Sequence, residues 1–176
     1  MNKKFELTTE TKVVFGITLH RIRALVAFGS VEAGELGGWI EKEENLSADG
    51  NAWVYGNARV YGNARVSGNA WVYGNAWVSG NAWVYGDARV SGNARVYGAG
   101  AIFWVGGVGS RNGTTTFFAC KDKKIRVVCG CFFGTLDEFS RAVSKTHGNS
   151  EYAKVYMLAI EMAKARIDLS KVEIDE

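Results

Sequence analysis

The sequence predicts a mainly β protein whose central region is wound from short strands, and two observations lead to this prediction. Residues 51–98 consist of one six-residue unit repeated eight times without interruption: NAWVYG, NARVYG, NARVSG, NAWVYG, NAWVSG, NAWVYG, DARVSG and NARVYG. Ala and Val lie two positions apart in every unit, so an extended chain directs them to one side and Trp/Arg and Tyr/Ser to the other. Gly followed by Asn or Asp favours a turn between units. We therefore expect each unit to form a strand and a corner, with three strands in a coil of 18 residues.

Two other structures for this region fit the repeat poorly. A period of six with a Gly-Asn pair at most junctions would interrupt an amphipathic helix. A disordered low-complexity segment is the other alternative, but the regular Ala and Val rows and the six Trp of the chain indicate a packed core.

The repeat resembles the hexapeptide-repeat, left-handed β-helix family. Members of that family carry an aliphatic residue at one inward position and a small residue two positions earlier. Three such pairs in this sequence are Ala52 with Val54, Ala58 with Val60, and Ala64 with Val66. The resemblance implies a left-handed parallel β-helix. The preceding segment NLSADG fits the same register with Leu46 and Ala48 inward, so we expect the β-helix to span residues 45–100.

The segments on either side of the repeat differ from it in character. Residues 1–44 contain short apolar runs, KFELT, KVVF, TLHRIRALVAF and GGWI, which predict an N-terminal β cap over the open end of the β-helix. Residues 101–176 predict a small C-terminal α/β domain. Its expected strands are AIFWV, TTTFFAC and KIRVVCGCFF, and the last two form a β-hairpin that turns at Asp122-Lys123.

Two helices are expected at the end of this C-terminal domain. In GTLDEFSRAVSKTHG, Thr135 and Glu138 have the spacing of a capping box, and Gly148 follows the last turn. The longer segment NSEYAKVYMLAIEMAKARIDL predicts a second helix. One face of it carries apolar residues at helical spacing, namely Tyr152, Val155, Leu158, Ala159 and Met162.

All three segments together resemble a type of protein common in bacteriophage and prophage genomes. The resemblance covers LHRIRAL…GELGGWIEKEENLS, the NARVYG array and GSRNG…CGCFFGTLDEF…AKVYMLAIEMAK. It implies a phage-linked protein in the host cytoplasm, and it assigns no chemistry to particular residues. The sequence shows no apolar signal segment and no membrane span, and its three Cys, an odd number, favour a reducing compartment.

The outward positions of the repeat place Trp and Arg in rows. With 18 residues in a coil, the rows are Trp53–Trp71–Arg89, Arg59–Trp77–Arg95 and Arg65–Trp83. Strands about 4.8 Å apart bring these side chains into contact, and Arg over a Trp ring is a favourable cation–π arrangement. Such rows can serve simply to reinforce the sheet, and two other uses also fit them.

Four outward Trp side chains form more exposed aromatic surface than a soluble monomer usually carries. Packing between the subunits of a homotrimer would cover it. Alternatively, the rows bind a ligand, because Trp and Arg together stack bases and hold phosphates.

A glycine-rich loop is the second candidate for ligand binding. In GGVGSRNG, residues 106–113, backbone N–H groups can cradle an anion, and Ser110 and Arg111 would add contacts. The loop lacks the Lys-Ser/Thr ending of a P-loop. Its simpler interpretation is a connector between the β-helix and the C-terminal domain.

The sequence offers few residues for catalysis or metal binding. Acyl transfer on this fold generally needs a His between subunits, but the two His of the chain are His20, in a cap strand, and His147, beside a helix end. Cys129 and Cys131 are expected on one face of a strand, without the further ligands that a zinc site requires. No spacing rule supports a nucleophilic Cys131 acting with His147. We therefore predict no catalytic residue, no metal and no cofactor.

These observations predict a non-enzymatic, phage-linked binding protein that forms a homotrimer and either sequesters a nucleotide-like molecule or blocks a host defence protein. The predicted binding residues are Arg59, Trp77, Arg95, Arg65, Trp83, Trp53, Trp71, Ser110 and Arg111. A net charge of +3 is small for a protein dedicated to a nucleic acid polymer, and no membrane partner is expected. The alternatives are a hexapeptide-repeat acyltransferase that uses His147 and a structural component of a phage fibre.

Overall fold

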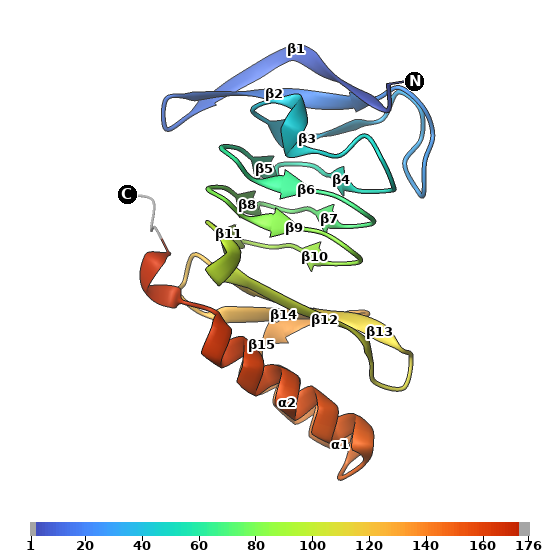
Figure 1. Cartoon of the computed structure of the whole chain (residues 1–176), viewed down its shortest axis with the longest axis vertical. Helices are drawn as coiled ribbons and strands as arrows, with labels where there is room; N and C mark the ends of the chain where they lie inside the picture. Colours follow the sequence, from blue (N-terminus) through green and yellow to red (C-terminus); the bar gives the residue numbers. More distant parts are fainter. Residues whose placement is uncertain (1–2, 173–176) are drawn as a thin grey trace.

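The computed structural model describes residues 3–172. It is a mainly β structure in which a parallel β-solenoid of about three turns lies between an N-terminal strand cap and a small C-terminal domain of strands and helices (Figure 1). The mainly β fold class predicted from the repeat is therefore confirmed.

The solenoid strands are the Trp/Arg-Val pairs of the repeat. They are β4 (Trp53–Val54), β5 (Arg59–Val60), β6 (Arg65–Val66), β7 (Trp71–Val72), β8 (Trp77–Val78), β9 (Trp83–Val84), β10 (Arg89–Val90) and β11 (Arg95–Val96). Strands 18 residues apart pair in parallel, as in Trp53 with Trp71 and Trp71 with Arg89. Ala52 and Val54 are fully buried, as are the equivalent residues of every later unit. These two rows form the core, and each buried Val contributes roughly 1.5 kcal/mol or more.

The N-terminal cap continues the solenoid sheet. It comprises β1 (Phe5–Val14), β2 (Ile17–Ala24) and β3 (Leu36–Ile40), and the strand order is β1-β2-β3-β5-β8-β11. Two predicted strands, KFELT and KVVF, are one strand with an irregularity between Leu7 and Thr11. Because β3 pairs in parallel with β5, the cap supplies hydrogen-bond partners that the first coil would otherwise lack.

The unit before the repeat departs from the predicted register. Leu46 is buried as expected, but it pairs with Val66, which is 20 residues later, and Ala48 is exposed, so its predicted inward position is wrong. The cause is a short 3-10 helix, η1 (Glu43–Asn45). The buried Asn45 amide donates hydrogen bonds to the carbonyls of Gly62 and Ala64, 3.2 and 2.8 Å away, where a strand would otherwise run.

The C-terminal domain contains one antiparallel sheet of β12 (Ile102–Val108), β13 (Gly113–Ala119), β14 (Ile125–Cys129) and β15 (Phe132–Thr135). The hairpin at Asp122-Lys123 is confirmed, since β13 and β14 pair directly across it. The predicted strand KIRVVCGCFF is instead two strands, because Gly130 adopts φ +57° and reverses the chain. Consequently the two thiols do not share one strand face: Cys129 is half-buried and Cys131 is exposed.

Helices α1 (Leu136–His147) and α2 (Glu151–Arg166) follow the sheet. The predicted capping box is present, since the Thr135 hydroxyl accepts from the Glu138 amide and the Glu138 carboxylate accepts from the Thr135 amide. Gly148 ends α1 as predicted.

Of the five apolar residues predicted to share one face of α2, Ala159 alone is buried. The buried residues of α2 are Ala153, Tyr156, Ala159, Ile160 and Ala163, whereas Tyr152, Val155, Leu158 and Met162 are exposed. The helix carries two apolar stripes, and the one richer in Ala packs against β12 and α1, because small side chains let the elements approach closely.

The C-terminal domain closes the second end of the solenoid. β13 packs against β10 and β11, and the Lys121 amide donates a hydrogen bond to the Asn93 carbonyl, 3.1 Å away. Short 3-10 helices, η2 (Ala99–Ala101) and η3 (Leu169–Lys171), complete this end. One continuous hydrophobic core runs from Phe5 in the cap to Val172 at the end of the described chain.

Candidate ligand-binding sites

The row Arg59–Trp77–Arg95 forms a closed stack. Trp77 lies between β5 and β11, with the Arg59 Cζ 4.6 Å and the Arg95 Cζ 3.9 Å from its ring centroid. Each such contact contributes about 0.5–2 kcal/mol. Because a guanidinium already lies over each face of Trp77, a base has no face left on which to stack. This row therefore reinforces the sheet.

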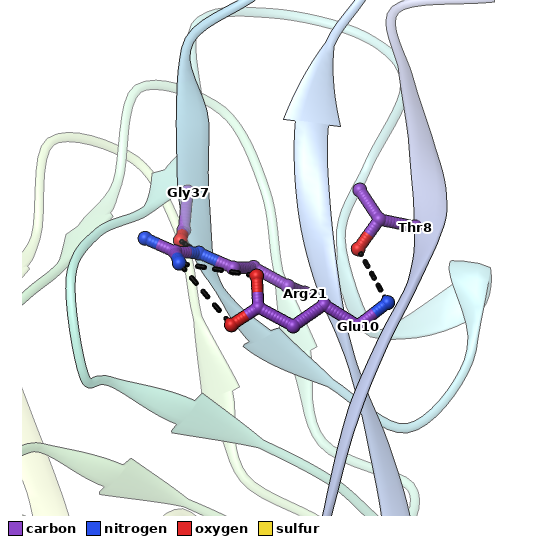
Figure 2. A network of polar contacts seen from close by, with 4 residues as sticks. All are labelled: Thr8, Glu10, Arg21 and Gly37. Carbon is purple, nitrogen blue, oxygen red and sulfur yellow. Dashed lines mark hydrogen bonds and ion pairs between the residues drawn. The ribbon is translucent and has the colours of Figure 1, made fainter.

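The same row extends into the cap through Trp39, which pairs with Arg59. The Arg21 guanidinium lies 5.8 Å from the Trp39 ring centroid and is held by two acceptors, as Figure 2 shows. Its Nε donates to the Gly37 carbonyl at 3.3 Å, and its Nη1 forms an ion pair with the Glu10 carboxylate at 3.2 Å. These contacts hold the three cap strands together, and the pairing of β3 with β5 joins the cap to the first coil.

Lys12 adds another cation to this surface. Its Nζ lies 3.8 Å from the Trp39 ring centroid. The pKa of Lys12 is lowered to about 8, chiefly by burial and also by the nearby Arg59 and Arg21 guanidinium groups, while the Glu10 carboxylate opposes this shift. The row is therefore electropositive, and the cost of gathering cations is offset by the Trp rings between them.

Trp53 is not on the surface. The repeat predicts that all four of its outward Trp side chains are exposed, and this is wrong for Trp53. It is fully buried, with ring centroids 6.3 Å from Phe5 and 5.3 Å from Phe28 of the cap. Trp71, the next in that row, is half-buried beside Arg89, whose Cζ lies 4.8 Å from its ring centroid. The cap covers the start of this row because the N-terminal segment folds back over the first coil.

Trp83 is the most exposed Trp of the repeat, at 56%. It lines a shallow groove of about 480 Å³ together with Arg65, whose Cζ lies 5.9 Å from its ring centroid. The other lining residues are Lys42, Glu44, Asn45, Gly62, Asn63, Ala64 and Asn81. This groove keeps Arg65 and Trp83 together, as predicted from the 18-residue period.

A larger cavity, of about 750 Å³, lies between the last coil and the C-terminal domain. The predicted residues Ser110 and Arg111 line it, as does Arg89 of β10. Its apolar wall includes Val108, Phe132, Phe139 and Val143, and further lining residues are Asp87, Thr114, Thr116, Cys129, Cys131, Thr146, His147 and Tyr156. The aromatic residues of this cavity could not be predicted from the sequence, because they come from segments that lie far apart in the chain.

The Gly-Ser-Arg loop is a hairpin turn between β12 and β13, within the C-terminal domain, and not a connector between domains. Gly109 has φ +73°, and a Cβ there would lie 1.9 Å from the Tyr156 hydroxyl. Only glycine fits both the turn and this close approach. The loop is therefore seated on α2 and holds Ser110 and Arg111 at the mouth of the cavity.

A buried polar chain supports the inner side of the loop. The Thr115 hydroxyl donates to the Cys129 Sγ at 3.2 Å, and the Cys129 thiol donates to the Tyr156 hydroxyl at 3.7 Å. Burial, followed by the contact with Cys129, raises the pKa of Tyr156 to about 12. The phenol thus stays protonated near neutral pH and fixes the position of α2 against β14.

The charged groups of the cavity favour an anion. Arg111 supplies a guanidinium group, which can bind phosphate or carboxylate in a fork geometry. Arg89 also lines the cavity, while its guanidinium lies over the Trp71 ring. The Asp87 carboxylate opposes them at the rim, where its Oδ1 accepts a hydrogen bond from the Asn69 amide at 3.0 Å. With an apolar aromatic wall beside the cations, the site suits a small anion that also carries a ring.

The residues considered for catalysis are only partly brought together. Cys131 and His147 line the same cavity, while His20 lies on β2, with its Nδ1 3.4 Å from the Thr8 carbonyl. The His147 ring centroid lies 5.7 Å from that of Tyr156, and within residues 3–172 His147 forms no hydrogen bond with a thiol. No group of three metal-ligating side chains occurs in the described part of the chain. Among the described helices, none is long and apolar enough to span a membrane.

Comparison with known proteins bears on the repeat. Residues 52–68, 58–74, 70–86 and 88–101 match the family described as YdcK β-solenoid repeat. The repeat is a β-solenoid. This similarity and the parallel pairing of the strands agree on the architecture of the central region, and the match does not extend to the cap or to the C-terminal helices. No curated protein shows a significant match to the chain.

Proposed function

We propose that this protein is a non-enzymatic binding protein that holds a small, nucleotide-like anion in the cavity between the last coil and the C-terminal domain. The observation that carries the proposal is the loop that brings Ser110 and Arg111 to a cavity whose lining includes aromatic residues. Ser110, which the sequence also singled out, lies beside Arg111 at its mouth.

The dimensions and chemistry of the cavity agree with such a ligand. Its volume of about 750 Å³ is within the range of sites for drug-sized molecules. The Arg111 guanidinium would bind the phosphate, the hydroxyls of Ser110 and Thr114 would bind phosphate or sugar oxygens, and the ring would lie against Phe132 and Phe139. The outward Trp rows, in contrast, are largely occupied by their own Arg partners.

Calorimetric titration with nucleoside mono-, di- and triphosphates tests this proposal. We expect the wild-type chain to bind at least one of them. Arg111→Ala should weaken binding about 10- to 150-fold, because it removes one charge-assisted hydrogen bond to the ligand. The matched control is Arg65→Ala, which removes a guanidinium from the separate Trp83 groove and should leave the affinity unchanged. Equal affinity of Arg111→Ala and wild type would contradict the proposal.

The biological setting forms the second part of the proposal. A phage-linked protein of the host cytoplasm that retains a nucleotide-like signal would act by sequestration, without turning the ligand over. Blocking of a host defence protein and a homotrimeric assembly stay predictions. Of the four Trp that suggested the trimer, Trp53 is fully buried and Trp77 is half-buried between Arg59 and Arg95, which weakens the argument for a trimer.

Acyl transfer is the alternative function that an observation favours, because His147 and Cys131 line the same cavity. In that case acyl-coenzyme A would be consumed with an amine acceptor, and His147→Ala would abolish turnover. If the chain binds its ligand without turning it over, and His147→Ala binds it equally well, the result favours a binding protein over an acyltransferase.

A further inference from the structure

Helix α2 carries an exposed apolar stripe that the ligand-binding proposal does not use. Its residues, Tyr152, Val155, Leu158 and Met162, are 48%, 41%, 65% and 57% exposed. They are spaced three, three and four positions apart, so they form one continuous strip along the helix. Figure 1 shows α2 at the end of the molecule opposite the N-terminal hairpin. A soluble monomer rarely leaves such a strip uncovered.

We propose that this stripe is the interface of a two-fold symmetric homodimer in which α2 packs antiparallel against α2 of a second copy. Around a two-fold axis near Met157, Val155 faces Leu158 of the partner subunit, and Tyr152 faces Met162 of the partner subunit. Each apolar residue therefore meets an apolar residue, and the Tyr–Met pair adds a favourable sulfur–aromatic contact.

The charges beside the stripe identify a second copy as the occupant. Lys154 and Glu161 lie on the same flank of the stripe, seven residues apart. In the antiparallel arrangement Lys154 meets Glu161 of the partner subunit, and the two-fold axis produces this pair twice. In a parallel arrangement Lys154 would instead face Ala159 of the partner subunit and gain no ion pair.

The local ion pairs permit this exchange at low cost. Within one chain, Lys154 pairs with Glu151 at 2.6 Å and Glu161 pairs with Lys164 at 2.8 Å. All four side chains are at least half exposed, so these pairs contribute little and can be replaced by pairs across the interface. The stripe is also separate from the cavity, whose only lining residue from α2 is Tyr156, on the buried side of the helix.

Sedimentation equilibrium of the full chain tests the proposal. We expect a monomer–dimer equilibrium with a dissociation constant below about 100 μM, and Leu158→Glu should weaken the dimer at least 100-fold, because Leu158 is buried at the axis on both subunits. Ser144→Glu, at an exposed position on α1, adds the same single negative charge as the matched control and should leave the dimer intact. Circular dichroism verifies that each variant is folded.

A charge exchange tests the antiparallel orientation. Lys154→Glu alone should weaken the dimer, since it places two carboxylates opposite each other at two symmetric positions. Adding Glu161→Lys should restore it, because the reversed pair is again complementary. A wild-type chain that is monomeric at 100 μM, or a larger assembly that Leu158→Glu leaves unchanged, would overturn the proposal, and failure of the double variant to restore the dimer would overturn the antiparallel arrangement.

Discussion

Replacement of Trp53 by Ala should destabilise the protein far more than the same replacement of Trp83, although both occupy the same position of the repeat. Trp53 is fully buried between the first coil and the cap, with Phe5 and Phe28 packed edge-on against its ring. The packing is tight, since a Cβ on Gly37 would lie 2.7 Å from the Trp53 Cζ2. Truncation of a buried Trp to Ala costs about 3–5 kcal/mol.

A more conservative change separates packing from polarity at this site. The Trp53 Nε1 is buried and has no hydrogen-bond partner within residues 3–172, so Trp53→Phe removes an unsatisfied donor while keeping most of the ring contacts. We expect Trp53→Phe to cost less than about 2 kcal/mol, because relief of the unsatisfied N–H offsets part of the lost packing. Trp83→Ala, at a side chain 56% exposed and contacted by Arg65, should cost about 1 kcal/mol or less.

Thermal denaturation followed by far-ultraviolet circular dichroism measures these differences without relying on Trp fluorescence. Trp53→Ala should lower the Tm by about 6–20 °C, and Trp83→Ala by about 4 °C or less. Equal losses for Trp53→Ala and Trp83→Ala would refute the assignment of Trp53 to the junction between cap and solenoid.

Three further predictions concern the loop, the helix cap and a buried lysine. Gly109→Ala should cost about 2 kcal/mol or more in thermal melts, because it combines a left-handed φ with a clash at the Tyr156 hydroxyl, while Gly113→Ala, whose Cβ would meet nothing within 4 Å, should be neutral. The Thr135 amide and hydroxyl hold the pKa of Glu138 below its ordinary value, so the stability that wild type has over Glu138→Gln should be complete above pH 5 and lost as the pH falls below about 4.3. Burial lowers the pKa of Lys4 to about 8, so the stability of wild type relative to Lys4→Met should rise between pH 8 and pH 10, where only the unfolded chain keeps the proton. Chemical denaturation at stepped pH values checks both pH dependences, and flat difference curves would contradict them.

The six-residue period was sufficient to predict the solenoid, because every constraint on it is local. Ala and Val two positions apart set the inward rows, and the 18-residue offset set which outward residues stack, as in Arg59 with Trp77. The burial of Trp53 could not be predicted in the same way. It depends on Phe28, which lies 25 positions earlier and reaches Trp53 only after the N-terminal segment folds back.

The errors in the C-terminal domain arose where one pattern was compatible with two structures. KIRVVCGCFF is mostly apolar with no turn pair inside it, and the positive φ of Gly130 divides it into two strands. Helix α2 has two apolar stripes, and sequence periodicity favoured the one with larger side chains, whereas packing on β12 selected the stripe rich in Ala. The sequence suggests an anion-binding loop at Ser110 and Arg111, but the cavity that they line could not be predicted, because its aromatic residues and Arg89 come from other elements.

The most direct test of the ligand-binding proposal is a native mass spectrum of the protein after incubation with the small-molecule fraction of a bacterial cell extract. Wild type should retain an adduct with the mass of a nucleotide-like anion, Arg111→Ala should lose it, and Arg65→Ala should keep it. A wild-type chain that stays bare, or an adduct that persists unchanged in Arg111→Ala, would contradict a ligand site in the cavity between the last coil and the C-terminal domain.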